Sequence, residues 1–309
     1  MLLSVIVVNW NARDDLALCL ASLEAVSGEP VEIVVVDNGS QDNSAAMVRK
    51  DFPGVRLLEE GANLGFAEGC NRGIEASTGT WAVLLNNDAV VERDWAERLT
   101  ASIGRAPDDC GMLQCTMYFL DKPGVVNSLG LWLKRDGGAI DRGEGKTAVP
   151  GHDEEIFCPT GGAAAYRRTM LEQIRLSTGY LDRDHFCYCE DFDIGWRAQL
   201  AGWRARLAHD AVVHHRWHGS TRKRGRGWFV TMTRLNRIRT LLKNASPGFL
   251  AATMPFTLWE LAELGWHGGL KSCLKLPAAV RESLRVRPEV SQLAQGRHRA
   301  VEKRWVGVR

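Results

Sequence analysis

The sequence predicts an α/β fold with a mainly parallel central sheet flanked by helices, followed by a basic, amphipathic helical C-terminal tail. Short aliphatic runs alternate with stretches of helical periodicity in the first part of the chain. A polar cluster follows each of these runs. Residues 1–215 contain 20 Lys and Arg against 32 Asp and Glu, whereas residues 216–309 contain 19 against 5. An acidic α/β body is thus joined to a basic tail, which suits an anionic partner surface.

The length and composition are those of a globular chain. Its 309 residues, 45% of them apolar, are sufficient for a sizeable core. Eight scattered cysteines include no Cys-x-x-Cys pair, so we expect no disulfide framework and a reducing compartment. The apolar residues 2–8 have no basic segment before them, so they predict a strand and no signal peptide.

Four aliphatic runs are predicted to be strands of a parallel sheet, because segments of helical periodicity connect them. Leu16, Leu20 and Leu23 have this periodicity after the first run, and residues 93–106 are predicted to form the fourth helix. The predicted strands are Leu3–Val8, Glu32–Val36, Val55–Leu58 and Trp81–Leu85.

Polar residues follow all four predicted strands. In an open parallel sheet, ligands bind beyond the carboxyl ends of the strands, so these side chains are expected to meet at one site. The clusters are Asn9-Trp10-Asn11, Asp37-Asn38-Gly39-Ser40, Gly61-Ala62-Asn63 and Asn86-Asn87-Asp88.

The next part of the chain has a looser pattern. Residues 111–157 contain scattered glycines and charges, and we expect a poorly ordered insertion that is mobile or faces an acceptor. Regular structure is then predicted to return as a Gly161-Gly162 turn, a strand through Tyr166, a helix beginning near Glu190 and a strand ending at His214-His215.

Asp37 and the segment that begins at Asn63 are suited to hold a nucleotide. The Asp37 carboxylate can accept hydrogen bonds from a nucleobase N–H or a ribose hydroxyl, although Asp-Asn-Gly-Ser is also ordinary turn chemistry. Asn63, Gly65 and Asn71 place a glycine and amides around the start of a short helix, where backbone N–H groups can approach a ligand. The alternative is that the glycines of this segment ease packing between helix and sheet.

Asp88 is a candidate ligand for Mg²⁺ or Mn²⁺, because it supplies hard oxygens at a strand end. One carboxylate makes a weak site, so diphosphate oxygens of a bound donor would have to complete it. His214, His215 or His218 could add an imidazole, which would favour Mn²⁺. The alternative for each histidine is an ordinary surface or core residue. A structural zinc site is disfavoured, since the Cys-x-Cys at Cys187 has no second pair at zinc spacing.

Glu190, Asp191 and Asp193 crowd the predicted start of a helix. Acidic residues complement the helix dipole there, but three exceed what capping requires. One carboxylate is therefore a candidate general base that takes the proton from an attacking hydroxyl. Asp193 is placed to cap or orient, and Arg197 can pair with Asp193 or Glu190 across one turn.

The sequence contains these motifs in order: Val7-Val8-Asn9-Trp10-Asn11; Val35-Val36-Asp37-Asn38-Gly39-Ser40; Asn63-Leu64-Gly65-Phe66 with Asn71 and Gly73; Leu84-Leu85-Asn86-Asn87-Asp88; Gly161-Gly162-Ala163; Glu190-Asp191-Phe192-Asp193 with Trp196-Arg197 and Gly202; His214-His215 before Gly219-Ser220. Together they closely resemble family-2 glycosyltransferases of the GT-A fold, specifically the rhamnosyltransferase-like, non-processive branch. The resemblance extends over residues 3 to about 220, and the order and spacing of the motifs make it specific.

The resemblance implies an inverting, metal-dependent transfer of a sugar from a nucleotide-diphosphate donor to a hydroxyl. It implies that Asp37 contacts the donor base, that Asp88 holds the metal on the diphosphate and that Asp191 is the general base. His214 or His215 is implied as a further metal ligand.

Two departures from common family patterns bear on this activity. Asn86 replaces the first acid of the Asp-x-Asp metal motif, and no Gln-x-x-Arg-Trp of processive synthases follows the base, so we expect one sugar per acceptor encounter. The implied donor-binding residues are Asn9, Trp10, Asn11, Asp37, Asn38, Asn63, Gly65, Phe66, Asn71, Asn87 and Asp88. The implied acceptor-binding or orienting residues are Gly161, Gly162, Glu190, Asp193 and Arg197.

The tail is predicted to lie on anionic lipid. Residues 216–243 contain nine basic and no acidic residues, interleaved with Trp and Leu. The apolar residues 249–266 are interrupted by Glu260 and Glu263 and are too few to favour crossing a bilayer. The alternative is a helical subdomain that packs on the core or mediates oligomers. The expected domains are 1–220, with a donor half to about 110 and an acceptor half from about 111, and the tail 221–309.

Other classes of protein fit less well. A dinucleotide-dependent oxidoreductase lacks its Gly-x-Gly-x-x-Gly, and a nucleotidyltransferase lacks its glycine-rich basic loop after the first strand. A non-catalytic module that binds nucleotide-sugars or membranes stays as the alternative. By family analogy, we expect a dTDP-, UDP- or GDP-sugar donor, rhamnose among the candidates, and a glycan or lipid-linked acceptor in cell-surface polysaccharide biosynthesis. The expected location is cytoplasmic, peripheral on the inner face of the membrane, with no nucleic-acid partner.

Overall fold

The computed structural model describes residues 3–28, 30–216 and 225–307. Strands and helices alternate through the first part of the chain, as the sequence predicts. The strands are β1 (Leu3–Asn9), β2 (Glu32–Asp37), β3 (Arg56–Glu59), β4 (Trp81–Asn86), β5 (Ala89–Val91), β6 (Cys110–Phe119), β7 (Val126–Ser128), β8 (Leu131–Leu133), β9 (Ala139–Asp141), β10 (Glu155–Ile156), β11 (Ala163–Arg167) and β12 (Arg204–His215). The helices are α1 (Arg13–Glu24), α2 (Ser44–Asp51), α3 (Phe66–Ala76), α4 (Trp95–Arg105), α5 (Arg168–Ile174), the 3-10 turn η1 (Arg183–His185), α6 (Glu190–Ala201), α7 (Arg226–Asn244), α8 (Pro247–Cys273), α9 (Leu276–Ala294) and α10 (His298–Trp305).

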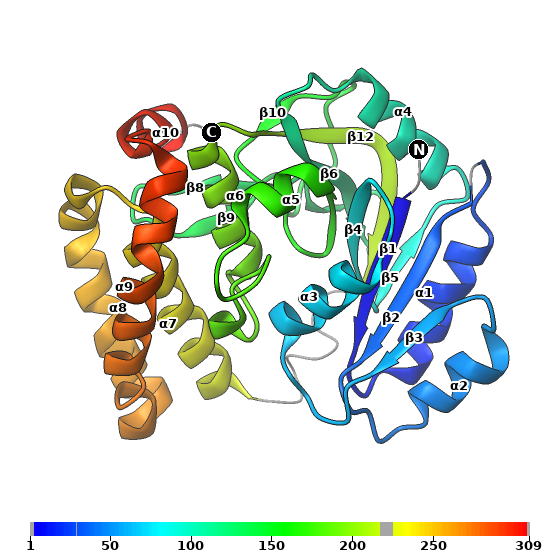
Figure 1. The fold of residues 1–309 in the computed structure, drawn as a ribbon, viewed down its shortest axis with the longest axis horizontal. Helices are drawn as coiled ribbons and strands as arrows, with labels where there is room; N and C mark the ends of the chain where they lie inside the picture. The colour runs from blue at the N-terminus through cyan, green and yellow to red at the C-terminus, as the bar shows by residue number, and fades with distance from the viewer. Residues whose placement is uncertain (1–2, 29, 217–224, 308–309) are drawn as a thin grey trace.

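One central sheet organises the molecule, with the strand order β10-β12-β6-β11-β4-β1-β2-β3 (Figure 1). Strands β1 to β4 are parallel, and Val7 of β1 pairs with Val35 of β2 and Leu85 of β4. Strand β11 runs antiparallel between β4 and β6, and β12 is parallel to β6. The predicted α/β fold with a mainly parallel sheet flanked by helices is therefore confirmed.

Helices cover both faces of this sheet, which explains why its central strands are mostly apolar. All residues of β1 are buried. Side chains of α1, α2 and α4 form one core with the sheet, and side chains of α3, α5 and α6 form another on the opposite face. This packing brings the polar ends of β1, β2 and β4 to one edge, because the three strands are parallel and adjacent.

The expectation of a poorly ordered insertion at residues 111–157 is wrong. Residues 110–119 form β6, which lies inside the sheet between β11 and β12. From the sequence, the glycines of this segment indicate poor order, but they form tight turns. Gly130, Gly137 and Gly143 all have positive φ angles. Local composition did not reveal this strand because its two neighbours along the central sheet, β11 and β12, come from residues far later in the chain.

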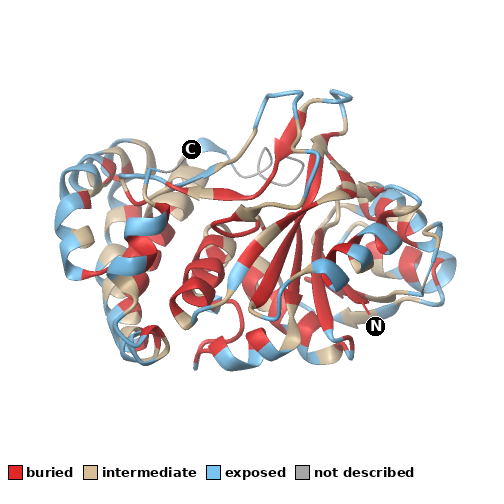
Figure 2. Cartoon of the chain, turned by 90° about the horizontal axis from the view of Figure 1, so that it is seen from above, coloured by how far each residue is buried: buried red, intermediate tan, exposed pale blue. Residues whose placement is uncertain are grey.

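The C-terminal helices pack on the body of the molecule. Helices α7, α9 and α10 all contact α6, and α8 packs on α7 at the outer side (Figures 1 and 2). Leu241, Val286 and Val290 share a buried cluster with Phe157 and Trp196 of the body. The structure thus shows the packed helical arrangement that the sequence left as an alternative. In the described ranges, none of the helices combines the length and apolar composition needed to cross a bilayer.

Candidate active site

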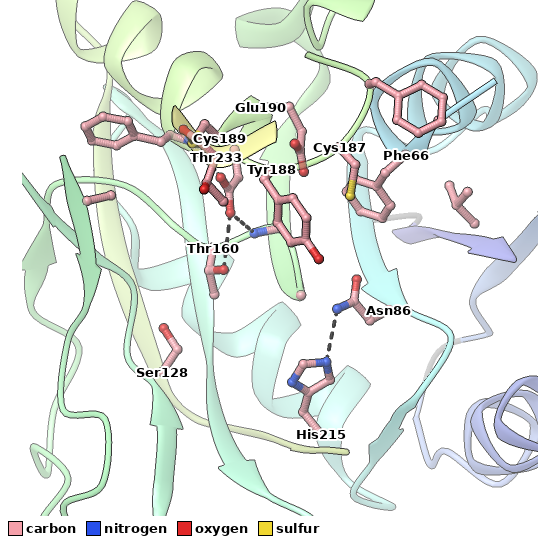
Figure 3. A pocket seen from close by; sticks show the side chains of 18 of the residues that line it. Phe66, Asn86, Ser128, Thr160, Cys187, Tyr188, Cys189, Glu190, His215 and Thr233 are labelled. Carbon is pink, nitrogen blue, oxygen red and sulfur yellow. Dashed lines mark hydrogen bonds between the residues drawn. The ribbon is translucent and has the colours of Figure 1, made fainter. Parts of the chain in front are cut away.

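A cavity of about 520 Å³ lies beyond the carboxyl ends of β1 and β4. Its other walls are formed by residues of β6 to β9, the segment before β11, the loop before α6, the start of α6 and the first turns of α7. Figure 3 shows His215 and Asn86 on one side of this cavity and Glu190 across it. The sequence-predicted residues that line it are Trp10, Asn38, Asn63, Gly65, Phe66, Asn87, Asp88, Gly161, Gly162, Glu190, Asp191 and His215.

Asp88 and His215 form a pair on the strand-end side of the cavity. His215 Nε2 lies 3.0 Å from Asp88 Oδ1 and 3.0 Å from Asn86 Nδ2. On the other edge of the ring, Nδ1 lies 2.8 Å from Asn127 Oδ1, and with the amide placed this way Nδ1 must carry the proton. Nε2 faces Asp88, where it can donate a hydrogen bond to the carboxylate or, once deprotonated, ligate a metal beside it.

The charge state of Asp88 also suits a cation. Burial alone would raise the pKa of this carboxyl, but the hydrogen bond and charge of His215 outweigh burial and hold the pKa below its ordinary value. One ionised carboxylate and one imidazole therefore converge at the cavity wall. These two ligands fit Mn²⁺ or Mg²⁺ if oxygens of a bound diphosphate complete the shell.

The neighbouring histidine points away from this pair. Successive side chains of a strand alternate, so His214 lies on the other face of β12, where its Nε2 is 3.1 Å from Glu92 Oε1 and its ring stacks on Tyr118. Of the two candidate histidines among the described residues, the structure brings His215 to the cavity. His218 falls outside the described residues.

Asp191 is held at the opposite side of the cavity by three hydrogen bonds. Its Oδ2 accepts from Gly161 N at 2.8 Å and Thr160 Oγ1 at 3.2 Å, and its Oδ1 accepts from Phe192 N at 2.7 Å. Burial raises the pKa of Asp191 more than these hydrogen bonds lower it. A half-buried carboxylate with a raised pKa and a fixed direction can accept a proton from a hydroxyl in the cavity.

Glu190 is more deeply buried than its neighbour and has a different chemistry. Burial, followed by the nearby charge of Asp191, raises the pKa of Glu190 to about 8. Its Oε2 has no hydrogen-bond partner within the described part of the chain. With a pKa of about 8, Glu190 carries its proton at neutral pH.

Asn9 and Asp37 lie in the layer behind the cavity wall. Asn9 Nδ2 donates to Asp37 Oδ1 at 3.2 Å, and Asn9 Oδ1 accepts from Asn87 Nδ2 at 2.8 Å. Asp37 Oδ2 accepts from Ser40 N at 2.9 Å, which closes the predicted turn. Asn87 does line the cavity, so the two inner residues orient an amide that a ligand can reach.

Gly65 allows the loop before α6 to close over α3. Its φ angle is +89°, and a Cβ atom at this position would lie 2.5 Å from the Phe186 carbonyl oxygen. Asn38 Nδ2 donates to the Gly65 carbonyl at 3.0 Å. The Asn38 Oδ1 atom is buried without a hydrogen-bond partner among the described residues, which leaves an acceptor beside the cavity for a ligand.

Four other predicted residues do not line the cavity. Asn11 accepts from the backbone of the turn after β2 at Gln41. Asn71 Oδ1 and Nδ2 bond to the backbone of Leu181 at 2.9 Å each. Asp193 and Arg197 pair inside the core at 3.0 Å, which resolves the two pairings that the sequence allowed for this arginine.

Asp193 belongs to a buried ion cluster behind the cavity. Asp182, His185 and Asp193 could each offer a metal-ligand atom within 4.8 Å of the others. The Lys243 ammonium, however, lies between the two carboxylates, 2.8 Å from Asp193 Oδ1 and hydrogen-bonded to Asp182. Burial and the Lys243 charge lower the pKa of His185 to about 4. An ammonium already fills this position, so the group is a structural ion cluster that joins α7 to α6.

Sequence reasoning missed the contribution of α7 to the cavity. Trp228, Phe229 and Thr233 line it, and Tyr188 packs on both aromatic rings with centroids 5.9 and 5.2 Å apart. The helical spacing of these residues predicts an apolar helix face, but it does not indicate which part of the chain that face contacts. Cys187 also lines the cavity, as part of the loop before α6.

Comparisons with known proteins show the family of the chain. Residues 4–175 match the model of glycosyl transferase family 2. The chain is 26% identical to the N-acetylglucosaminyl-diphospho-decaprenol L-rhamnosyltransferase of Mycobacterium tuberculosis, in an alignment that covers 96% of this chain and 99% of that protein.

Two solved structures share the fold at low sequence identity. The mannosyltransferase PcManGT of Pyrobaculum calidifontis, in complex with GDP-Man and Mn²⁺, has a TM-score of 0.52 and 18% identity, covering 96% of this chain and 86% of that one. GalNAc-T7, with UDP, GalNAc and Mn²⁺, has a TM-score of 0.66 and 14% identity, covering 98% and 57%. The sheet and the polar cavity at its strand ends thus define a GT-A glycosyltransferase. Since the family model matches more than half of the chain, the protein belongs to glycosyl transferase family 2.

Proposed function

We propose that the protein transfers a single sugar, with inversion, from a nucleotide-diphosphate donor to a hydroxyl of a lipid-linked glycan. The observation that supports this most is that one cavity contains both the Asp88–His215 pair and the Asp191 carboxylate. The pair suits the diphosphate end of a donor. The carboxylate, fixed by three hydrogen bonds, suits the end where the acceptor hydroxyl arrives.

The chemistry then follows from the positions of these side chains. Asp88 and His215 would hold Mg²⁺ or Mn²⁺, which supplies positive charge to the leaving diphosphate when bound. Asp191 takes the proton of the acceptor hydroxyl, and the freed oxygen forms a bond to the anomeric carbon. The bond from that carbon to the diphosphate oxygen breaks on the opposite side, so the configuration inverts.

The remaining predicted residues are assigned supporting roles in this proposal. Trp10, Asn38, Asn63, Gly65, Phe66 and Asn87 surround the donor, with Asn9 and Asp37 behind them. Gly161, Gly162 and protonated Glu190 surround the acceptor end. Residues 1–220 would form the catalytic domain, with the donor half to about residue 110, and residues 221–309 the helical region.

Donor and acceptor are proposed from the relative that aligns over the whole chain. That protein is named for transferring L-rhamnose to N-acetylglucosaminyl-diphospho-decaprenol. We therefore propose rhamnose from a thymidine-diphosphate donor as the first candidate, with UDP- and GDP-sugars next, and a polyprenyl-diphosphate sugar as acceptor. The enzyme would act in cell-surface polysaccharide assembly, peripherally at the cytoplasmic face of the membrane.

The test is a transfer assay with purified protein, a panel of nucleotide-sugars and a polyprenyl-diphosphate-N-acetylglucosamine acceptor. We expect one donor to give a product extended by a single sugar, with Mg²⁺ or Mn²⁺ but not with chelator. The Asp88→Asn variant should lose this transfer. If no nucleotide-sugar is bound or consumed with any metal and acceptor, the enzyme proposal fails. Binding without consumption would leave the alternative, a non-catalytic nucleotide-sugar-binding module.

A further inference from the structure

The outer face of α8 is apolar over most of its length. Every exposed residue from Ala251 to Leu270 is apolar, glycine or proline. Side chains of this size are normally covered, and Trp266 is 86% exposed and Leu270 76% exposed. The larger members of this outer face are Met254, Phe256, Leu258, Trp259 and Trp266, and the exposed Leu270 follows the kink at Gly269.

The charged groups of α8 are turned toward α7 and neutralised there. Glu260 accepts from Arg234 at 2.9 Å and from Arg237, and Glu263 accepts from Arg234 at 2.7 Å. These pairs remove the two acidic charges that interrupt the apolar segment in the sequence. The face that remains on the outside is therefore uncharged as well as apolar, and α8 is the outermost helix of the C-terminal group (Figures 1 and 2).

The surroundings of this face are basic. Lys271 and Lys275 follow its apolar part, and both are exposed. Residues 225–307 contain 14 Lys and Arg against 5 Glu. Beyond the two of α8, each glutamate is engaged: Glu282 pairs with Arg239, Glu289 accepts from Ser177 and Glu302 accepts from Ser246. This charge balance favours a partner surface that is anionic.

The face also lies next to the cavity wall. The first turn of α7 packs on the end of α8, since a Cβ atom on Gly227 would lie 2.8 Å from the His267 carbonyl oxygen. Thr231 Oγ1 lies 2.8 Å from Ser272 Oγ in the same contact. Trp228 and Phe229, in that turn of α7, line the cavity. A surface that covers α8 would therefore border the candidate active site.

We propose that the outer face of α8 inserts into an anionic lipid monolayer, with the helix lying along the membrane surface. Its aliphatic side chains and Trp266 enter the boundary between head groups and acyl chains, where tryptophan is favoured. The lysines at its end contact anionic head groups. This proposal rests on the proposed function in one respect: a lipid-linked acceptor would explain why the enzyme binds a membrane.

The test is cosedimentation of the full chain with vesicles of phosphatidylcholine alone or mixed with phosphatidylglycerol. We expect binding that depends on phosphatidylglycerol and that weakens about tenfold or more in a Trp259→Ser, Trp266→Ser double variant, because burial of two indole rings is lost. Leu18→Ser on α1, also exposed, is the matched control and should bind like the unchanged chain. Tryptophan quenching by brominated lipid should be reduced in the double variant.

Equal vesicle binding by the double variant, or no binding by the unchanged chain, would overturn the proposal. Sedimentation could also show that the unchanged chain is a dimer without lipid and that the double variant is a monomer. That result would overturn the proposal too, because the outer face of α8 would then be an interface between two copies of the chain. Transfer to a water-soluble acceptor analogue should be unaffected by the double substitution. If vesicle binding occurs as expected while no sugar is transferred, the proposed function fails and the lipid surface stands.

A separate observation concerns the loop that leads into Glu190 and Asp191. Three of its four residues, Phe186, Tyr188 and Cys189, have positive φ angles of 59°, 73° and 65° although none is glycine. Such conformations cost free energy and persist only where the surroundings impose them. The loop forms a wall of the cavity and ends where the candidate base begins.

One side chain of α7 binds this loop at several points. Asn236 is fully buried, and its Nδ2 donates to the carbonyl oxygens of His185 at 2.7 Å, Cys187 at 2.9 Å and Tyr188 at 3.0 Å. Two N–H bonds thus serve three carbonyls along the strained segment. Its Oδ1 lies 3.2 Å from Arg239 Nη1, which fixes the orientation of the amide. We infer that Asn236 is a positioning residue that holds the loop, and through it Asp191, in place for the proposed transfer.

The test compares Asn236→Leu with Ser283→Ala, which removes a buried hydrogen bond of α9 to Ala279. We expect Asn236→Leu to lower kcat about 10- to 100-fold while the Kd of the donor stays within about twofold, because misplacement by about 1 Å has effects of this size. Ser283→Ala should alter neither. Unchanged kcat in Asn236→Leu would overturn the inference, as would a loss of kcat that merely follows the unfolded fraction. If the unchanged chain itself transfers no sugar, the proposed function fails. Faster amide hydrogen exchange of residues 186–189 in Asn236→Leu would then still show that Asn236 holds the loop, and unchanged exchange would show that it does not.

Discussion

The strand-end turns and the C-terminal helices both build the cavity, but by different physical routes. Strands β1, β2 and β4 are neighbours in one parallel sheet, so their polar ends must meet at one edge. Helix α7 reaches the same cavity only because Trp228 and Phe229 follow the strand β12 in the chain and fold back over the loop before α6. The first contribution follows from a rule of sheet topology, and the second follows from contacts between distant residues.

The two regions also have different roles in the proposed reaction. The strand ends and the first turn of α6 supply the three groups that the proposed reaction uses, Asp88, His215 and Asp191. Helix α7 adds aromatic side chains to the cavity wall. Its Lys243 and Asn236 do not line the cavity but bind the start of α6 and the loop before it. Substitutions in the two sets should therefore change different measured quantities.

The largest expected effect is on turnover in Asp191→Asn. The amide cannot take the proton of the acceptor hydroxyl, so kcat should fall about 10²- to 10⁴-fold, while the Kd of the donor changes little. Steady-state kinetics and calorimetry of donor binding measure the two quantities. If Asp191→Asn keeps more than a tenth of the turnover, another group is the base.

Lys243→Met should instead reduce stability. It leaves the buried carboxylates of Asp182 and Asp193 without their ammonium, a change that typically lowers the free energy of unfolding by about 3–5 kcal/mol. Urea unfolding measures it. Arg204→Ala breaks an exposed pair with Asp109 and is the control that should leave stability nearly unchanged. A Lys243→Met protein as stable as the unchanged chain would show that the cluster does not join α7 to the body in the way described.

The two adjacent histidines of β12 give a matched pair of variants. His215→Ala removes the imidazole beside Asp88 and should lower the apparent affinity for Mn²⁺ about 10- to 100-fold. His214→Ala removes a ring that faces Glu92 on the other side of the strand and should have no such effect. Activity titrated with Mn²⁺ distinguishes them. Equal effects of both substitutions would remove His215 from the proposed metal site.

Glu190 is expected to make stability depend on pH. Burial raises its pKa from 4.5 to about 8 in the folded protein, so the folded state keeps a proton that the unfolded chain has released. The stability from this proton is fully present below pH 4.5 and is lost as pH rises through about 8. Unfolding of the unchanged chain and of Glu190→Gln, compared from pH 5 to 9, should show the unchanged chain losing stability relative to the variant. A difference that is constant with pH would place Glu190 in contact with water.

The sequence was sufficient for the fold and for the strand-end side of the cavity. Apolar runs between polar clusters predicted β1 to β4, and the period of a strand determines that His214 and His215 face opposite sides. Which of the two faces Asp88 could not be inferred, because it depends on how β12 pairs with β6 across a register shift.

The other features of the fold and the site could not be predicted, because they depend on contacts between residues far apart in the sequence. Asn71 stood in a motif typical of donor binding, yet its amide bonds to Leu181, more than a hundred residues away. Residues 110–119 looked loose because a strand buried by distant partners need not show a local pattern. Asn236 could not be identified from the sequence either, because nothing in the helix around it indicates that its side chain binds three backbone carbonyls of a distant segment.

The central claim is a single inverting transfer in which Asp191 is the base. The most direct measurement is the anomeric configuration of the first product formed, by proton NMR, with the donor identified in the transfer assay. The account predicts one added sugar whose configuration is opposite to that of the donor, and no detectable product with Asp191→Asn in the same time. A product that retains the configuration of the donor would contradict direct attack by the acceptor hydroxyl in this cavity.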